Sequence, residues 1–390
     1  MSPSTFWRLD PEVTFLNHGS FGACPGPVLD AQGELRARLE REPVLFMQRQ
    51  LERLLDGARA RLAEFVRADP DDLAFVANAT TGVNTVLRSL ELSPGDELVT
   101  TDHEYNACRN ALEAVARAAR ARVVVVPIPF PLPDPDVVVD AVVGAITERT
   151  KLLLIDHVTS PTGLVLPIER IIPAYRERGI DVLVDGAHAP GMLDLDLNAL
   201  GATYYTGNCH KWMCAPKGAA LLWVRRDRQE RVHPLVISHG ANSTRTDRSR
   251  FRLEFDFTGT DDYTAYLSVP AAIDALGTLF PGGWKELRER NRRLALEGRD
   301  ILCRVLRIPP PAPDSMIGSL AAVPIPEASP GGLDADLNHL LFDHHRIEVP
   351  VPVWPRWPKR LLRISAQAYN DRTQYERLAS VLQTIGLAPR

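Results

Sequence analysis

Short hydrophobic runs recur through the middle of this chain, and helical segments separate them. The runs are Leu73–Val76, Glu97–Thr100, Val123–Pro127, Lys151–Asp156, Asp181–Asp185, Ala202–Thr206 and Ala219–Val224. This alternation is typical of parallel strands joined by helices, and the nearly continuous apolar character of the runs indicates that helices cover both faces of the sheet. The pattern predicts an α/β fold with a mostly parallel seven-stranded sheet flanked by helices.

Helical patterns also flank this central region. Two of them precede it, in LDAQGELRARLE and QLERLLDGARARLAEFV, and a long charged helix begins near Trp284. Shorter strand and helix patterns follow, and the last helix spans Thr373–Ile385. We therefore expect an N-terminal entry segment at 1–25, a large domain at 26–280 and a smaller α+β C-terminal domain at 281–390.

Charge and composition narrow the class of partner. The net charge is −4 and the isoelectric point is near 6.2, which argues against a nucleic-acid partner. No apolar run reaches the roughly 18 residues of a membrane span, and the N-terminal residues do not resemble a signal peptide. We expect a cytoplasmic protein with no membrane partner. The five cysteines lack CxxC spacing, which indicates neither a disulfide framework nor a zinc knuckle.

Lysine is scarce, and one lysine has an unusual position. The chain has 45 Lys and Arg residues, of which only five are lysines, namely Lys151, Lys211, Lys217, Lys285 and Lys359. Lys211 stands in GNCHKW, just after a predicted strand, among aromatic and small residues. Asp185 ends the preceding strand, where a buried carboxylate is costly unless a cation pairs with it. These two positions predict a buried pair of functional groups at the carboxyl edge of the sheet, where ligands bind.

A third feature at the same edge fits a phosphate site, and taken alone a threonine N-cap explains it equally well. The segment NATTGVN places Thr80 and Thr81 at the start of a helix, where backbone N–H groups and the helix dipole bind anions. A lysine that forms a Schiff base, a carboxylate that keeps a pyridinium nitrogen protonated and a phosphate site are together what pyridoxal phosphate requires. The sequence therefore predicts a pyridoxal 5'-phosphate cofactor.

Several motifs in chain order resemble a known family. They are FLNHGSFG, NATTGVN, TDHEYNA, DHVTSPTG, VDGAHAPG, TGNCHKW, FTGTDDYTAYLSV and LLRISAQAYN. Their combination resembles the fold-type I pyridoxal-phosphate enzymes of the class V aminotransferase family, and most closely the isopenicillin N epimerase-like branch, which is related to cysteine C–S lyases and desulfurases. The resemblance covers essentially the whole chain.

The resemblance implies roles for individual residues. The implied cofactor-binding set is Thr80, Thr81, His103, Asp185, His188, His210, Lys211 and Thr260. In this set Lys211, His103 and Asp185 would be catalytic, with His103 stacked on the pyridine ring. Thr260 would reach the phosphate of a neighbouring subunit, which implies a homodimer with shared active sites. The implied substrate-binding set is Asn17, Tyr105, Arg363 and Asn370, in which Arg363 would bind the α-carboxylate.

The sequence departs from the family pattern at one position. It also argues against a persulfide relay and against a metal site. Asn208 stands where relatives often have Ser or Thr. The region Pro309–Leu333 contains no cysteine, so we do not expect a persulfide relay of the desulfurase kind. His339, Asp343 and His344 share a helical face, but they lack a further ligand, and we predict no metal site.

The cofactor does not decide which reaction follows. Lys211 is expected to remove the α-proton of an L-amino acid, after which elimination, epimerisation and transamination all remain open. We expect C–S cleavage of cysteine or a cysteine S-conjugate, with epimerisation and transamination as alternatives. A non-catalytic sensor with the same fold is a further alternative, but it would have no need for Lys211. The segments Asn17–Phe21, Pro43–Gln50 and Pro350–Trp357 are expected to shape the substrate pocket.

Overall fold

The structure, a computed structural model, describes residues 6–328 and 336–388. Within these residues the largest sheet has seven strands in the order β2-β8-β7-β6-β5-β3-β4. Strand β8 is antiparallel to its neighbours β2 and β7, and the other pairings are parallel. The prediction of a mostly parallel seven-stranded sheet is confirmed.

The strands follow the hydrophobic runs closely. Their bounds are β2 Leu73–Val76, β3 Glu97–Thr101, β4 Arg122–Val126, β5 Thr150–Asp156, β6 Asp181–Asp185, β7 Tyr204–Asn208 and β8 Ala220–Val224. Strand β7 lies two residues further along the chain than its predicted run, so Asn208 is the last residue of this strand.

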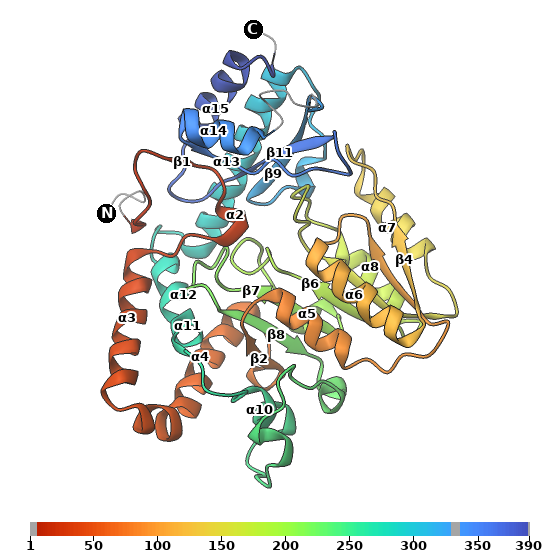
Figure 1. Cartoon of the computed structure of the whole chain (residues 1–390), viewed down its shortest axis with the longest axis vertical. Helices are drawn as coiled ribbons and strands as arrows, with labels where there is room; N and C mark the ends of the chain where they lie inside the picture. Colours follow the sequence, from red (N-terminus) through yellow and green to blue (C-terminus); the bar gives the residue numbers. More distant parts are fainter. Residues whose placement is uncertain (1–5, 329–335, 389–390) are drawn as a thin grey trace.

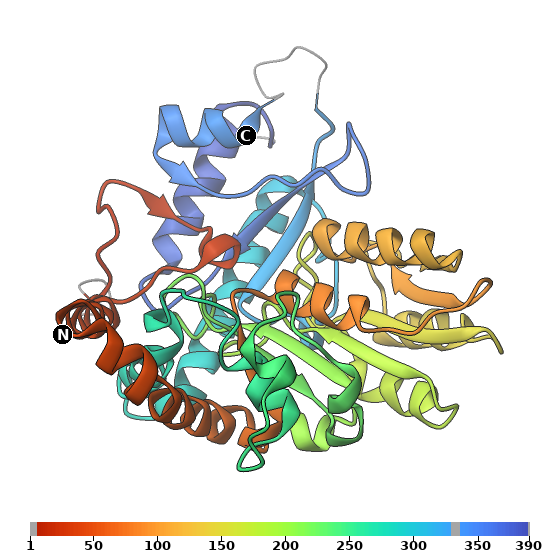
Figure 2. The same cartoon turned by 60° about the horizontal axis from the view of Figure 1, so that its bottom comes forward.

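Helices cover both faces of this sheet, as the apolar runs predicted (Figures 1 and 2). Along β5, Leu152 and Leu154 pack into one buried cluster, while Leu153 and Ile155 pack into another on the opposite face. The first cluster includes side chains from α5 (Ala79–Arg88), α6 (Asn106–Ala119) and α10 (Arg250–Phe255). The second is larger and includes side chains from α4 (Leu51–Val66), α7 (Pro135–Gly144), α8 (Ile168–Arg176) and α12 (Val269–Gly277). Alternate residues of β5 therefore pack into different buried clusters, as the two-residue period of a strand requires.

A smaller lobe lies beyond the carboxyl edge of the large sheet (Figure 1). Its elements are α13 Gly283–Leu306, β9 Leu320–Ile325, α14 Leu337–His345, β10 Ile347–Glu348, β11 Arg360–Ser365 and α15 Arg372–Thr384. Strands β9 and β11 form an antiparallel pair, so this lobe is α+β as predicted. The part of Pro309–Leu333 beyond residue 328 lies outside the described residues.

The N-terminal segment joins this smaller lobe. Strand β1 (Thr14–Phe15) pairs in parallel with β10, and the short helix α2 (His18–Phe21) follows it between the two lobes (Figure 1). Helices α3 (Gly26–Arg41), α9 (Leu197–Leu200) and α11 (Thr264–Leu267) complete the described α-helices. As a result, residues close to the N-terminus contact both the Lys211 segment and strand β11.

None of the described helices is both long enough and apolar enough to cross a bilayer.

Candidate active site

Lys211 follows the end of β7 and faces the junction between the lobes. Its Nζ lies 3.2 Å from Nε2 of His188. Burial, followed by the nearby Arg363 guanidinium, lowers the pKa of Lys211 to about 8, although Asp185 and Asp156 oppose the shift. A lysine amine that loses its proton near pH 8 has far more of the nucleophilic form than an exposed lysine.

Asp185 is the last residue of β6, in the middle of the sheet, and its carboxylate is buried. Oδ1 accepts a hydrogen bond from the Ala187 N–H at 2.9 Å, and Oδ2 accepts one from the Cys108 thiol at 3.1 Å. Burial raises its pKa, while these donors and Lys211 oppose the increase. Asp185 can therefore stay ionised beside a cationic partner such as a protonated ring nitrogen.

Two further acids lie beside Asp185, and the sequence analysis assigned no role to either. Asp156 is its direct register partner on β5, and oxygen atoms of Glu104 and Asp185 lie within 4.8 Å of each other and of the Cys108 sulfur. Glu104 Oε1 and Asp156 Oδ2 are buried without a hydrogen-bond partner among the described residues. Burial and the neighbouring carboxylates raise the pKa of both groups well above the usual range, so we interpret both as neutral acids.

His103 is held by both ring nitrogens. Nε2 donates to the Ile128 carbonyl at 3.0 Å, which leaves Nδ1 to accept from the Thr162 hydroxyl at 2.8 Å. The ring is buried and meets the Trp354 ring edge-on, with 4.6 Å between centroids. Burial lowers its pKa. A neutral ring fixed in this way suits a stacking platform better than a proton carrier.

The predicted phosphate residues lie at the start of α5 and after β7. Asn78 caps α5, and its Oδ1 accepts from the N–H and the hydroxyl of Thr81 at 2.8 and 3.1 Å. Asn208 Oδ1 accepts from the Ala79 N–H at 2.8 Å, so this departure from the family pattern ties the end of β7 to the start of the helix. Thr80 is the second residue of α5 and is partly buried.

His210 is fixed in a similar way, since its Nδ1 donates to the Ala219 carbonyl at 3.0 Å. Burial lowers its pKa to about 4, so the ring is neutral at pH 7 and its Nε2 has no proton to donate. An anion bound nearby would favour protonation at this nitrogen.

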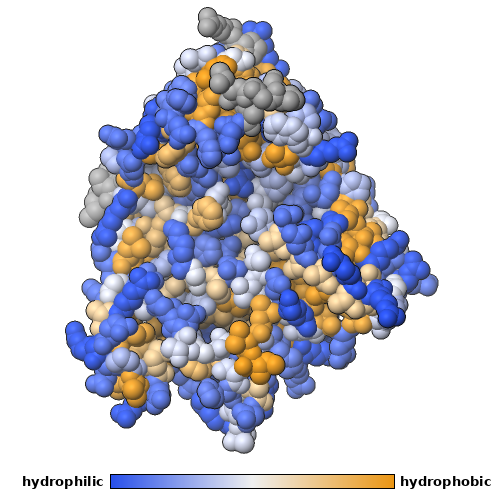
Figure 3. Space-filling view, in the orientation of Figure 1, coloured by the Kyte–Doolittle hydropathy of each residue, from blue (hydrophilic) through white to orange (hydrophobic). Residues whose placement is uncertain are grey.

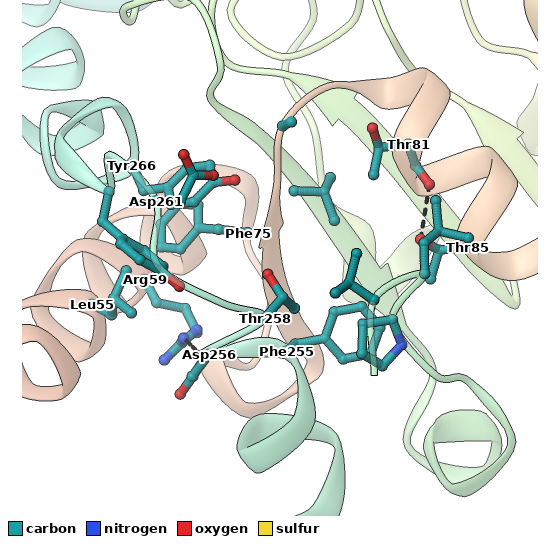
Figure 4. Close-up of a pocket in the computed structure, with 16 residues that line it drawn as sticks. Leu55, Arg59, Phe75, Thr81, Thr85, Phe255, Asp256, Thr258, Asp261 and Tyr266 are labelled. Atoms are coloured by element: carbon teal, nitrogen blue, oxygen red, sulfur yellow. Dashed lines mark hydrogen bonds and ion pairs between the residues drawn. The ribbon is translucent and has the colours of Figure 1, made fainter. Parts of the chain in front are cut away.

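A small cavity opens beside the start of α5 (Figure 4). Its volume is about 140 Å³, and Thr81, Thr258 and Asp261 are among the residues that line it. Thr260 belongs to the same loop but is exposed in the single chain. The structure therefore brings Thr81 and the loop of Thr260 to one place.

Arg363 lies in a second cavity, of about 480 Å³, between the two lobes. Its Nη1 donates to the Ser160 carbonyl at 2.5 Å, and its Nη2 donates to the Ser20 hydroxyl at 3.1 Å. No carboxylate pairs with it in the described chain, and Nε has no partner there. Burial lowers its pKa to about 10, so the guanidinium still carries its charge at pH 7 and can bind a carboxylate.

The other predicted substrate residues have different places. Tyr105, at the start of α6, lines the Arg363 cavity and is 45% exposed. Asn17 lies one step behind Arg363, because its Oδ1 accepts from Ser20 at 2.5 Å and its Nδ2 donates to Glu348 at 2.8 Å. Asn370 is buried, and its amide bonds to the Phe15 and Gln367 backbone and to Gln374. Its contacts are structural, and they do not place it in this cavity.

Two of the three segments expected to shape the pocket lie near Arg363. Residues Pro350–Trp354 line its cavity, and Ser20 of the Asn17–Phe21 segment holds the guanidinium. The Pro43–Gln50 stretch lies instead at the turn between α3 and α4, away from this cavity (Figure 1).

These residues fit pyridoxal phosphate. A lysine with a lowered pKa, an ionisable carboxylate at a buried strand end and the start of α5 lie at one edge of the sheet. The fold and the site together define a pyridoxal-phosphate enzyme of fold type I.

Comparison with known proteins identifies the family. The chain belongs to the aminotransferase class-V family, whose model matches residues 25–303. It is 41% identical to isopenicillin N epimerase of Amycolatopsis lactamdurans, over 97% of this chain and 96% of that protein. It is 30% identical to a probable chloroplastic L-cysteine desulfhydrase of Arabidopsis thaliana, over 97% of this chain and 84% of that protein.

Solved structures agree on the fold. The cystine C–S lyase C-DES, in complex with cysteine persulfide, matches with a TM-score of 0.79 at 24% identity, over 97% of this chain and 99% of that chain. The cysteine desulfurase CsdA of Escherichia coli matches with the same TM-score at 21% identity, over 100% and 99% of the two chains. At these identities the likeness establishes the fold type.

Proposed function

We propose that this enzyme removes the α-proton of a cysteine-type amino acid and cleaves its C–S bond. When bound, pyridoxal phosphate supplies the electron sink that stabilises negative charge at the α-carbon. Lys211 is the proposed attachment residue and the base that takes the α-proton at Nζ. Asp185 would hold the cationic ring nitrogen, and His103 would pack against the ring.

Arg363 is the proposed carboxylate anchor. Its guanidinium is buried, charged and free of any carboxylate partner among the described residues, so an incoming α-carboxylate would satisfy it. Backbone and hydroxyl oxygens of Ser160 and Ser20 already orient both Nη atoms. Such orientation directs the α-carbon of the substrate toward a fixed place between Arg363 and Lys211.

The preference for elimination rests on the proton-transfer groups near Lys211. Lys211 can serve as a base, whereas His103, which would pack against the cofactor ring, is already hydrogen-bonded. Elimination needs a single base, and Lys211 has a pKa lowered to about 8. An epimerase also needs an acid on the other face, whereas both ring nitrogens of His103 already have partners. His157 has a partner at one ring nitrogen, since its Nδ1 bonds to the Tyr205 hydroxyl at 3.0 Å.

The five cysteines are poorly suited to a persulfide relay, so we propose C–S cleavage without one. All five are buried. Burial raises the pKa of Cys24 to about 12 and that of Cys303 to about 11, so these thiols are poor nucleophiles at pH 7.

Epimerisation is the second candidate, supported by the 41% identity to an isopenicillin N epimerase over nearly the full length. Tyr105 would be the opposing acid, because its side chain is 45% exposed and lines the cavity that contains Arg363. Reaction in deuterated water with a panel of amino acids and cysteine S-conjugates separates the two. Elimination gives pyruvate, ammonia and either hydrogen sulfide from cysteine or a thiol from an S-conjugate, whereas an inverted, α-deuterated amino acid without pyruvate would contradict it.

We further propose a homodimer in which Thr260 reaches the phosphate of the neighbouring subunit. Leu235 and Val236 line the cavity beside Thr81 and are 43% and 57% exposed, and Ile237 is 77% exposed. Figure 3, drawn in the orientation of Figure 1, shows a hydrophobic patch above the position of α10. Contiguous exposed apolar side chains of this kind are typical of interfaces. Light scattering should give twice the chain mass, and a monomer that binds the cofactor normally would refute the proposal.

A further inference from the structure

Three side chains form a line that ends at the nitrogen of Lys211. The indole Nε1 of Trp212 lies 3.3 Å from Nδ1 of His188, and Nε2 of the same imidazole lies 3.2 Å from Lys211 Nζ. His188 and Trp212 are both buried, at 2% and 1% exposure, so water does not compete for these contacts. Trp212 also packs against the His18 ring at a centroid distance of 4.9 Å.

The chemistry of these groups determines where the protons lie. An indole nitrogen donates and cannot accept, so Nδ1 of His188 must be the acceptor of the Trp212 N–H. The titratable groups that face His188 are Lys211, Arg363, His18 and His210, and after burial each of them lowers its pKa further. The imidazole is therefore neutral, and its single proton lies on Nε2.

We infer that Trp212 is a positioning residue that holds His188 in its Nε2–H tautomer, so that His188 donates a hydrogen bond to the nitrogen of Lys211. A nitrogen that accepts this bond must offer a lone pair, so the arrangement favours the unprotonated nitrogen. This inference rests on the proposed role of Lys211 as the residue that holds the cofactor.

Trp212→Phe tests the inference in the holoenzyme. Without the indole N–H, His188 can move its proton to Nδ1 and accept at Nε2 from a protonated Lys211 nitrogen. The pH midpoint of the visible absorbance of the bound cofactor should then rise by about one unit, the size expected for one hydrogen bond. Trp223→Phe is the matched control, because Trp223 is a buried strand residue whose Nε1 has no partner among the described residues.

A double-mutant cycle separates this role from simple packing. In a His188→Leu background, Trp212→Phe should leave the midpoint unchanged, because there is no imidazole to orient. An equal shift in both backgrounds would overturn the inference. So would a midpoint in Trp212→Phe equal to that of the native enzyme.

Histidine-labelled ¹⁵N NMR of the native holoenzyme gives an independent readout. The His188 nitrogens should report a protonated Nε2 and an unprotonated Nδ1, and a mixture should appear in Trp212→Phe. A native Nδ1–H tautomer would overturn the inference. Failure of the proposed role of Lys211 has a different signature, since the visible band would then survive Lys211→Ala.

Discussion

The base of the site beneath Asp185 and the cavity around Arg363 have opposite arrangements of charge. Beneath Asp185, three carboxyl groups are buried close together with a thiol. Around Arg363, the hydrogen-bond partners of the buried cation among the described residues are hydroxyl and carbonyl oxygens. A buried ionised carboxylate such as Asp185 favours a bound cation, and a buried arginine without a carboxylate partner favours a bound anion. One region is therefore suited to a pyridinium nitrogen and the other to an α-carboxylate.

Lys211 lies between these regions, and its loss should have the largest effect. Lys211→Ala should lower turnover by at least about 1,000-fold and abolish the visible absorbance of the bound cofactor, because the proposed attachment residue and base would both be lost. Absorbance spectra and product assays check this. Lys285→Ala is the control, since Lys285 is 85% exposed on α13. Comparable turnover in the two variants would contradict the assignment.

Among the buried acids Glu104, Asp156 and Asp185, we expect amide substitutions to have unequal effects on turnover. Asp185→Asn should lower turnover by roughly 100-fold, because it removes the one charge that the cluster holds. Asp156→Asn should change it far less, since an amide has nearly the shape of a neutral acid. Steady-state kinetics of both variants measures the difference. If Asp156→Asn proved as harmful as Asp185→Asn, Asp156 would also be ionised in the native enzyme.

The Arg363 cavity should affect substrate binding more than the cofactor. Arg363→Leu should raise KM by roughly 10- to 100-fold, the cost of a charge-assisted bidentate pair, and leave the cofactor spectrum intact. Arg372→Leu provides an exposed control on α15, where Arg372 pairs only with Glu376 in the described contacts. An unchanged KM would place the carboxylate elsewhere.

The lowered pKa of Lys211 should appear as a pH dependence of cofactor uptake. Only the unprotonated amine attacks the aldehyde, and burial lowers the pKa of Lys211 to about 8. Uptake by the cofactor-free enzyme should therefore rise roughly tenfold between about pH 7 and pH 9 and level off above that. Stopped-flow absorbance follows this rise. A rate that keeps increasing beyond pH 10 would indicate an ordinary exposed lysine.

The smallest effect should come from Ser20, because its proposed role is to orient Arg363. Ser20→Ala removes the hydroxyl that accepts from Nη2 at 3.1 Å, and a threefold to tenfold rise in KM is expected for the loss of one hydrogen bond. Turnover at saturation should stay near the native value. A larger fall in turnover than rise in KM would mean that Ser20 acts on the reaction itself.

The sequence predicts the position of those candidate residues whose signal lies in one local segment. Strand-end positions predicted Asp185 and Lys211, and hydrophobic periodicity predicted the sheet. The sequence does not predict contacts between segments that are far apart along the chain. Ser20 and Arg363 are 343 positions apart, and contacts such as the pairing of β1 with β10 bring the N-terminal segment to this lobe.

Two further contacts show where the motif patterns were insufficient. Glu104 belongs to a motif that had been noted, but its proximity to Asp185 depends on how α6 packs against the sheet. Asn370 is expected at the substrate, and its amide also bonds to the Phe15 backbone and to Gln374 of α15. Polar residues in a family motif can serve the fold as well as the ligand, and the sequence does not separate these uses.

Borohydride reduction of the holoenzyme, followed by peptide mass spectrometry, tests the central claim most directly. Reduction fixes the cofactor to the lysine that holds it, and the chain has only five lysines to distinguish. The account predicts a phosphopyridoxyl adduct on the peptide that contains Lys211 and none on the peptides of Lys151, Lys217, Lys285 and Lys359. An adduct on any of those four, or an unmodified Lys211 in a protein that retains its colour, would contradict it.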